Sequence, residues 1–279
     1  MILVTGATGN VGRHVVELLT ARGEKTRVLA RDPQRAAGLG ATEVVQGDLT
    51  QPRTLPAALD GVDAVFLFAA PGCGPDLVAA AERAGVQRVV LLSSDSIDDE
   101  QAEQSNPIAA YHAEIERALR GSRLAWTFLR SGHMAINVLP WAAQIKAGDV
   151  VRAPYAQATS APVHEADLAE AAVVALTEPG HEGRTYRLTG PDSLTSAEQL
   201  ALIGAAIGRP LRYEEQTPEA AREQMSRFIP PFILDTLMAG SAASVGRTAT
   251  VLPTVEELTG RPARSFAAWA RDRAGDFAA

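Results

Sequence analysis

The chain opens with a strand, a glycine-rich turn and a helix, and this feature limits its fold more than any other. The apolar run Ile2–Val4 predicts a buried strand, and Gly6, Gly9 and Gly12 follow it at three-residue spacing. The amphipathic residues 11–19 then predict a helix. In such a turn the first glycine permits a sharp exit from the strand, the second lets the backbone approach a pyrophosphate, and the third lets the helix pack closely on the sheet.

The position of this turn decides how it is interpreted. A glycine triplet alone is a weak motif, and its place between a strand and a helix is what makes it informative. The unpaired N–H groups and the dipole at the helix N-terminus favour an anion. The alternative is a glycine-rich turn that binds nothing. We expect the pyrophosphate of a dinucleotide to contact Gly6, Thr8, Gly9, Asn10 and Val11.

The first half of the chain alternates between strand and helix patterns. This alternation predicts an α/β fold, a Rossmann-type doubly wound parallel sheet with helices on both faces. We expect further strands at 26–30, 42–46, 64–69, 88–92 and 124–129, and helices at 52–59, 75–84 and 107–119.

After Arg130 the alternation changes, and a smaller C-terminal substrate lobe is expected. Residues 134–147 suit a helix that Pro140 should kink or divide. Parts of the second half, including a strand near residues 186–188, should rejoin the sheet. We also expect a strand at 149–152 and helices at 165–176, 196–207 and 264–274. We assign residues 1–130 plus about 155–190 to a dinucleotide-binding domain, and about 131–154 plus 191–279 to the substrate lobe.

Composition excludes several functional classes. The 279 residues carry a net charge of −7, and an acidic protein repels phosphate backbones, so direct nucleic-acid binding is not expected. The single cysteine, Cys73, excludes an intramolecular disulfide and fits a reducing compartment; it is expected to be a small buried side chain rather than a redox group. No apolar run is long enough to span a membrane. We expect a cytoplasmic monomer or homodimer that binds neither membrane nor metal.

The end of the second strand predicts which nicotinamide coenzyme is bound. An acidic side chain at this position favours NAD, whereas an arginine favours the 2′-phosphate of NADP. Arg31 follows the strand and Arg35 comes one helical turn later, so NADPH is favoured over NADH. Asp32 could instead bond the ribose of NAD, but before Pro33 we interpret it as a helix cap. The alternative for the two arginines is a pair of solvated charges.

Other contacts are expected where the strands end, because ligands of such sheets bind beyond the carboxyl ends. Asp48 and Leu49 should flank the adenine, although Asp48 could equally cap the next helix. Phe68, which alone would be read as a core residue, should line the ribose and pyrophosphate path with Ala69 and Ala70. Ser93 and Ser94 should lie near the nicotinamide.

The pattern resembles the NmrA-like branch of the atypical short-chain dehydrogenase/reductase superfamily along almost the whole chain. Members of that branch include NAD(P)H-dependent quinone and azo reductases, enzymes of aromatic natural-product pathways, and non-catalytic sensors of nicotinamide redox state. The matching segments are 5–12, 29–33, 47–49, 112–116, 130–134 with Asn137, and 257–262 with Phe266 and Trp269.

The catalytic residues depart from the tyrosine–lysine pair of the familiar enzymes of this fold, because no tyrosine here has a lysine four residues later. His112 and Glu116 lie on one face of the expected helix, as the resemblance implies. Glu116 could bond the nicotinamide ribose, and His112 could donate a proton near neutral pH. His133 is a second proton donor to consider. The alternative for His112 is a packing or surface residue.

These residues favour an NADPH-dependent oxidoreductase that transfers hydride to a quinone-like or polycyclic aromatic substrate, or to another conjugated electrophile. A non-catalytic redox sensor stays open, and an isomerase or epimerase is a third hypothesis that the poor acid–base set disfavours. The substrate pocket is expected to include Tyr111, Met134, Asn137 and Trp141, whose alternative role is packing of the lobe.

Overall fold

The computed structural model describes residues 1–278, which divide into two compact units. Unit 1 comprises residues 1–131, 165–188 and 257–260, and unit 2 comprises 132–164, 189–256 and the chain from 261 onward. Residues 155–164 therefore belong with unit 2, whereas the sequence grouped them with the dinucleotide-binding part. The cause is local pairing, since Val163 forms a β-bridge with Met134 and Ala158 forms one with Val245.

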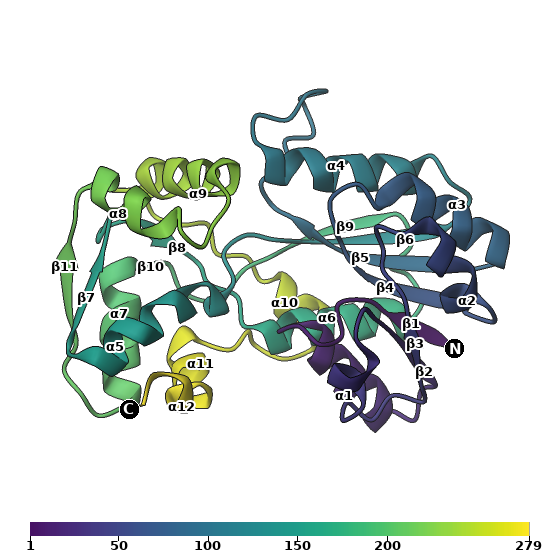
Figure 1. Cartoon of the computed structure of the whole chain (residues 1–279), viewed down its shortest axis with the longest axis horizontal. Helices are drawn as coiled ribbons and strands as arrows, with labels where there is room; N and C mark the ends of the chain where they lie inside the picture. The colour runs from purple at the N-terminus through teal and green to yellow at the C-terminus, as the bar shows by residue number, and fades with distance from the viewer. Residues whose placement is uncertain (279) are drawn as a thin grey trace. The chain divides into compact units, whose positions relative to one another are not determined.

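Unit 1 is built on a seven-stranded parallel sheet (Figure 1). Its order is β3-β2-β1-β4-β5-β6-β9, so the chain changes direction across the sheet between β1 and β4. The predicted Rossmann-type fold is thus confirmed, including the return of the second half to the sheet through β9. The strands are β1 (Ile2–Val4), β2 (Thr26–Ala30), β3 (Glu43–Gln46), β4 (Ala64–Phe68), β5 (Arg88–Ser94), β6 (Ala125–Ser131) and β9 (Arg184–Leu188).

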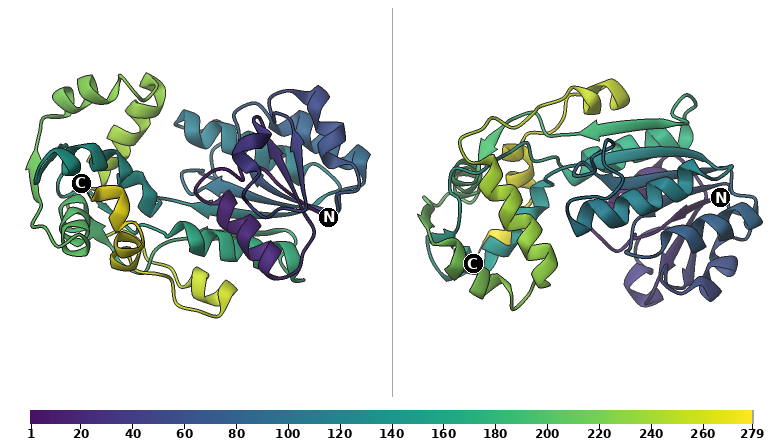
Figure 2. Two further views of the ribbon diagram at one scale, coloured as in Figure 1. Left: turned by 60° about the horizontal axis from the view of Figure 1, so that its bottom comes forward. Right: turned by 90° about the horizontal axis from the view of Figure 1, so that it is seen from above.

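Helices cover both faces of this sheet (Figures 1 and 2). One face carries α1 and α6, which lie side by side, and the other carries α2, α3 and α4. Apolar side chains of the central strands are buried between these layers, which explains their nearly continuous hydrophobic sequence. The helices are α1 (Gly12–Ala21), α2 (Leu55–Leu59), α3 (Gly74–Ala84), α4 (Pro107–Arg120) and α6 (Glu165–Thr177), with short 3₁₀ helices η1 (Pro33–Ala36) and η2 (Pro52–Thr54).

The start of α4 is fixed by its own sequence. Asn106 accepts a hydrogen bond from the backbone N–H of Ala109 at 2.8 Å, and Pro107 occupies the first helical position. These two residues set the point at which the long loop after β5 returns to the sheet.

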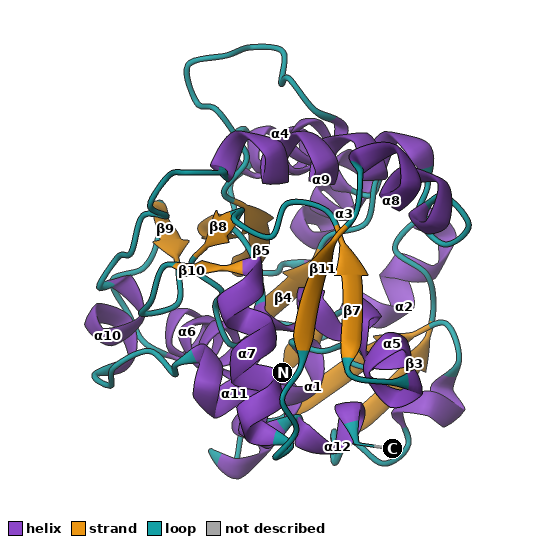
Figure 3. Cartoon of the chain, turned by 90° about the vertical axis from the view of Figure 1, so that its left-hand side faces the viewer, coloured by secondary structure: helices purple, strands orange, loops and turns teal. Residues whose placement is uncertain are grey.

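Unit 2 has two small sheets (Figure 3). Parallel β7 (Val150–Ala153) and β11 (Arg212–Glu215) form one, and antiparallel β8 (Thr159–Ser160) and β10 (Leu194–Thr195) form the other. Trp269, fully buried against Phe266 and Phe277, lies in the core of this unit. The helices of the second half are η3 (Ala135–Trp141), α5 (Ala142–Ala147), α7 (Ser196–Ala206), α8 (Pro218–Met225), α9 (Pro231–Ser244), α10 (Thr254–Thr259), α11 (Phe266–Asp272) and α12 (Ala274–Phe277).

Pro140 divides its segment as predicted, because the 3₁₀ helix η3 ends just after it and α5 begins separately. Thr195 and Glu198 form a capping box at the start of α7. Among residues 1–278, no helix combines the length and the apolar character that crossing a bilayer requires.

Candidate coenzyme and active site

The turn after β1 needs glycine at both ends. Gly6 has a φ of +62°, in the left-handed region, and a Cβ there would lie 2.7 Å from the Cβ of Phe68. A Cβ on Gly12 would lie 2.3 Å from the carbonyl oxygen of Gly6. The turn is closed by a hydrogen bond from the N–H of Gly9 to the oxygen of Gly6 at 2.9 Å. The close packing that the sequence predicted for this loop is therefore present.

The N-terminus of α1 has the properties of an anion site. Val11 provides no side-chain cap, the first turn holds no acidic residue, and the predicted contact residues Thr8, Gly9 and Asn10 are exposed. Free N–H groups at such a terminus are ready to bind a phosphate.

Arg13, in the same first turn, was not predicted as a site residue. Its Nε is buried and has no hydrogen-bond partner among the described residues. A cation at a helix N-terminus is unfavourable unless an anion lies nearby. The residues of this loop therefore fit the pyrophosphate of a dinucleotide. Its position directly after Gly12 was the available sequence signal.

A hollow of about 320 Å³ lies at the ends of β2 and β3. Arg31 is exposed at its rim, and its guanidinium has no side-chain hydrogen bond among residues 1–278. This leaves a free cation beside a cavity, which is the arrangement that a 2′-phosphate requires. The hollow is lined by Arg31, Gln46, Gly47, Asp48, Gln51 and Thr54.

Asp48 does not cap the following helix, because the N-cap residue of η2 is Gln51, and the contact of Asp48 with the adenine stays a prediction. Its Oδ1 accepts hydrogen bonds from the N–H of Thr50 at 2.9 Å and from the hydroxyl of Thr50 at 2.8 Å. These hydrogen bonds hold the pKa of Asp48 below its usual value. The side chain thus stabilises the turn after β3 and also lines the hollow, while Leu49 packs against the core.

Asp32 and Arg35 are distinguished from Arg31 by their positions. The carboxylate of Asp32 accepts a hydrogen bond from the N–H of Gln34 at 3.0 Å and begins η1, which confirms its interpretation as a cap. Arg35 is exposed on η1 but is absent from the residues that line the hollow. Of the two arginines, only Arg31 borders this cavity.

Phe68 is not a core residue. Its side chain is 42% exposed, beside Gly6, and its N–H donates to the hydroxyl of Thr5 at 2.8 Å. Ala69 and Ala70 follow it as buried and half-buried residues. Phe68 thus remains free to contact a ligand at this edge.

Cys73 is buried, as the sequence predicted. Burial raises the pKa of its thiol, so the thiol stays protonated at neutral pH.

Glu116 is the centre of a buried ionic network at the end of β5. Its Oε1 accepts from the Ser93 hydroxyl at 2.6 Å and from Arg130 Nε at 2.9 Å. Its Oε2 accepts from Arg130 Nη2 at 2.7 Å and lies 3.4 Å from Arg120 Nη2. The neighbouring hydroxyl of Ser94 is paired with that of Ser96 at 2.7 Å.

This network changes the expected role of Glu116. The side chain is only 3% exposed and both carboxylate oxygens are engaged within unit 1, so a ribose contact would require the network to open. No local sequence pattern indicates this pairing, because Glu116 and Arg130 lie on different elements. We therefore propose a positioning role for Glu116 in place of the direct contact.

His112 also differs from its expected chemistry. Desolvation lowers its pKa to about 4, and its Nδ1 is buried with no hydrogen-bond partner in the described chain. The ring packs against Tyr111, 4.1 Å between centroids, and burial raises the pKa of that tyrosine. The reason for choosing His112, an ordinary pKa near neutrality, is therefore wrong. Both side chains are neutral at pH 7, although the histidine keeps an N–H that can donate a hydrogen bond.

The remaining predicted residues belong to unit 2. His133 is exposed to solvent. Met134 is half-buried, Asn137 is exposed on η3, and Trp141 meets Tyr213 edge to face at 6.0 Å. Their contact with substrate stays a prediction.

Comparison with known proteins identifies the family of this chain. A family model described as NAD(P)H-binding matches residues 6–179. The chain belongs to this NAD(P)H-binding family. The (4-alkanoyl-5-oxo-2,5-dihydrofuran-3-yl)methyl phosphate reductase of Streptomyces griseus is 44% identical, covering 100% of this chain and 99% of that protein. The NAD(P)H azoreductase of Xenophilus azovorans is 37% identical over 100% of both chains.

A solved structure of similar shape is the NADPH-dependent quinone oxidoreductase QOR2 of Escherichia coli in complex with NADPH. Its TM-score is 0.81 and its identity 25%, covering 98% of this chain and 99% of that one. The resemblance that the sequence indicated is confirmed. Because full-length relatives are reductases, the chain is an NAD(P)H-dependent reductase.

Proposed function

We propose that this chain is an NADPH-dependent oxidoreductase that transfers hydride to a quinone-like, polycyclic aromatic or otherwise conjugated substrate. The observation that carries the proposal is the lack of an acid poised for neutral pH in the predicted catalytic set. His112 has a pKa of about 4, and Glu116 is held by Arg130 and Ser93. A site of this kind suits an acceptor whose reduced anion is delocalised and needs little help from an acid.

The choice of NADPH rests on Arg31. Its free guanidinium borders a hollow at the carboxyl ends of β2 and β3, beside Asp48, whose oxygen is already engaged by Thr50. A guanidinium there forms charge-assisted hydrogen bonds with a 2′-phosphate, whereas NADH offers it only hydroxyl groups.

Each residue of the candidate site can be assigned a role in binding the coenzyme or the substrate. When bound, the reduced nicotinamide supplies the hydride. The backbone N–H groups of Thr8 and Asn10 hold the pyrophosphate, and Arg13 offsets its charge. Phe68 covers the glycine turn from the end of β4. Neutral His112 orients the substrate oxygen by hydrogen bonding and leaves the final proton to water.

The relatives support the acceptor class. One is named for azo reduction and one for quinone reduction. The name of the Streptomyces griseus enzyme describes an unsaturated ring that carries a carbonyl and an alkanoyl group, which is a conjugated electrophile. These acceptors share a π-system that delocalises the charge left by hydride addition.

The test is stopped-flow loss of NADPH absorbance against a panel of a naphthoquinone, an azo dye and an α-acylbutenolide. We expect saturable oxidation of NADPH by at least one member, with NADH less effective at equal concentration. Tight NADPH binding without oxidation by any member would contradict the proposal and favour a redox sensor.

A further inference from the structure

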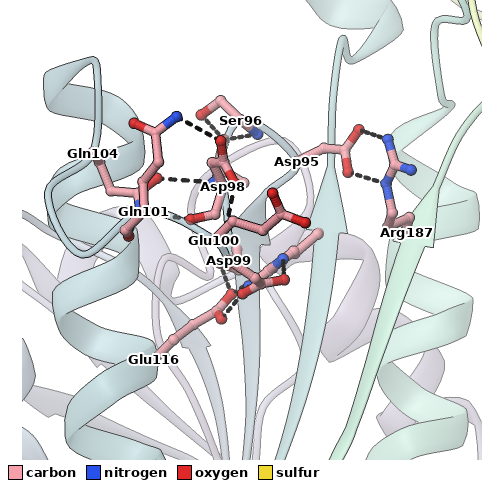
Figure 4. A network of polar contacts seen from close by, with 12 residues as sticks. Asp95, Ser96, Asp98, Asp99, Glu100, Gln101, Gln104, Glu116 and Arg187 are labelled. Atoms are coloured by element: carbon pink, nitrogen blue, oxygen red, sulfur yellow. Dashed lines mark hydrogen bonds and ion pairs between the residues drawn. The ribbon is translucent and has the colours of Figure 1, made fainter.

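The loop between β5 and α4, residues 95–106, is fastened to the carboxyl edge of the sheet by a buried arginine, Arg130. Figure 4 shows Asp99 of this loop above Glu116 of α4. Arg130 Nη1 and Nη2 each donate to a different oxygen of Asp99 at 2.7 Å. The Arg130 side chain is 5% exposed, whereas that of Asp99 is 65% exposed. A guanidinium in the interior thus holds a carboxylate of a surface loop.

Arg130 is well suited to binding Asp99 because Glu116 fixes the position of its guanidinium. Glu116 receives hydrogen bonds from the Nε and Nη2 of Arg130, and Ser93 binds the same carboxylate. The planar guanidinium can make both paired contacts at once, which a lysine ammonium cannot. The hydrogen bonds that Arg130 donates to Asp99 hold the pKa of Asp99 below its usual value, so this carboxylate stays ionised at neutral pH.

A second arginine fastens the beginning of the loop. Arg187 on β9 donates to both oxygens of Asp95, at 2.5 and 2.9 Å (Figure 4). The N–H of Asp95 donates to the carbonyl oxygen of Ser131 at 3.0 Å. The far end is fixed by the Asn106 cap of α4. The loop is therefore tied at its start, its middle and its end.

The interior of the loop is also organised by its own side chains. Asp98 accepts from the N–H of Glu100 at 3.0 Å and from the amide of Gln101 at 2.7 Å. Gln104 donates to the carbonyl oxygens of Asp98 and Gln101, both at 2.8 Å. Such bonding is typical of a fixed wall rather than of a mobile lid.

We propose that Arg130 is a positioning residue: through Asp99 it holds the 95–106 loop as a fixed wall beside the electrophile and sets the affinity for that substrate. This inference rests on the proposed function, because it requires the substrate to bind where β5 ends. The coenzyme loop and the Arg31 hollow lie on β1, β2 and β3, so the wall acts on substrate and leaves coenzyme binding unchanged.

The experiment compares Asp99→Asn with Glu100→Gln. Each variant removes one negative charge from the same loop, but Glu100 has no side-chain ion pair or hydrogen bond among the described residues. For Asp99→Asn we expect KM for the electrophile to rise about tenfold, in line with the loss of a paired charge-assisted contact, with kcat and the Kd of NADPH changed less than about twofold. Hydrogen exchange of the loop amides should rise in the same variant. Glu100→Gln should change none of these.

Two results overturn the inference. Equal changes in KM for the two variants would show an effect of loop charge alone, and unchanged loop exchange in Asp99→Asn would show that Arg130 does not hold the wall. If none of the acceptors tested supports NADPH oxidation by the wild-type protein, the proposed function fails separately. The role of the Arg130–Asp99 contact is then tested by menadione binding to the NADP⁺ complex. Weaker binding in Asp99→Asn than in Glu100→Gln supports the inference, and equal or undetectable binding refutes it.

Discussion

Glu116 and Arg130 form an ion pair in the interior of unit 1, with Arg130 Nη2 2.7 Å from Glu116 Oε2 and Arg130 Nε 2.9 Å from Glu116 Oε1. The carboxylate comes from α4 and the guanidinium from β6, and the two side chains are 3% and 5% exposed. The pair therefore joins a helix to the sheet at the edge where the substrate is proposed to bind.

Replacing Glu116 by leucine should destabilise the protein strongly. The guanidinium of Arg130 would stay buried with only Asp99 to balance it, and breaking a buried pair in this way costs about 3–5 kcal/mol. The measurement is the free energy of unfolding in urea. Glu114→Gln on the same helix is the control and should stay within about 0.5 kcal/mol of the wild type. Similar losses in the two variants would show that the pair adds no stability of its own.

Arg31→Ala should separate the two coenzymes. The guanidinium at the rim of the hollow has no side-chain hydrogen bond among residues 1–278, so its removal should weaken NADPH binding by about 10- to 100-fold, as expected for a charge-assisted contact. NADH binding should change less than about threefold. Fluorescence titration with both coenzymes measures this difference.

Arg35→Ala provides the matched control for that experiment, because Arg35 is exposed nearby but does not line the hollow. It should affect NADPH much less than Arg31→Ala does. Equal losses of NADPH and NADH affinity in Arg31→Ala would refute the assignment of a 2′-phosphate site.

The fold of unit 1 was predictable because its signals are local. Continuous apolar runs such as 64–68 mark strands covered on both faces, and glycines or prolines mark the ends of the helices. In unit 2 the signals are weaker. The strand Arg212–Glu215 has the sequence RYEE, which lacks apolar alternation, and β8 and β10 are only two residues long. Pairing with β7, rather than the residues themselves, makes β11 a strand.

The candidate site divides in the same way. The glycine turn and Arg31 are adjacent to the elements that position them, so spacing alone identified them. The Arg130 network joins Asp99, Glu116 and Ser93 from a loop, a helix and a strand, and no sequence pattern links these positions. The pKa of His112 depends on burial by distant residues, which is why its side chain was assigned ordinary acid–base chemistry.

Gly12→Ala should abolish saturable coenzyme binding or destabilise the fold around the loop. The added Cβ would lie 2.3 Å from the carbonyl oxygen and 2.6 Å from the carbonyl carbon of Gly6, both of which are backbone atoms that cannot rotate away. Gly38→Ala is the control, because its Cβ would meet no atom within 4 Å. NADPH titration and thermal unfolding of both variants measure the effect. Normal NADPH affinity in Gly12→Ala would contradict the close packing of α1 on this turn.

His112 should make folding stability depend on pH in acid. Its pKa is about 4 in the folded protein and about 6.5 when the chain is unfolded, so between these values the unfolded chain binds a proton that the folded protein does not. Stability due to this group is therefore complete above pH 6.5 and is lost as the pH falls toward 4, with a slope of at most about 1.4 kcal/mol per pH unit.

The variant His112→Phe removes this titration and keeps the volume of the ring, so its free energy of unfolding should fall less steeply between pH 6.5 and 4 than that of the wild type. His14→Gln is the control, since His14 makes only a surface contact with Glu17 and its replacement leaves His112 in place. Urea unfolding at a series of pH values measures the slopes. Parallel curves for His112→Phe and the wild type would mean that His112 titrates normally, and it would then regain its place as a proton donor.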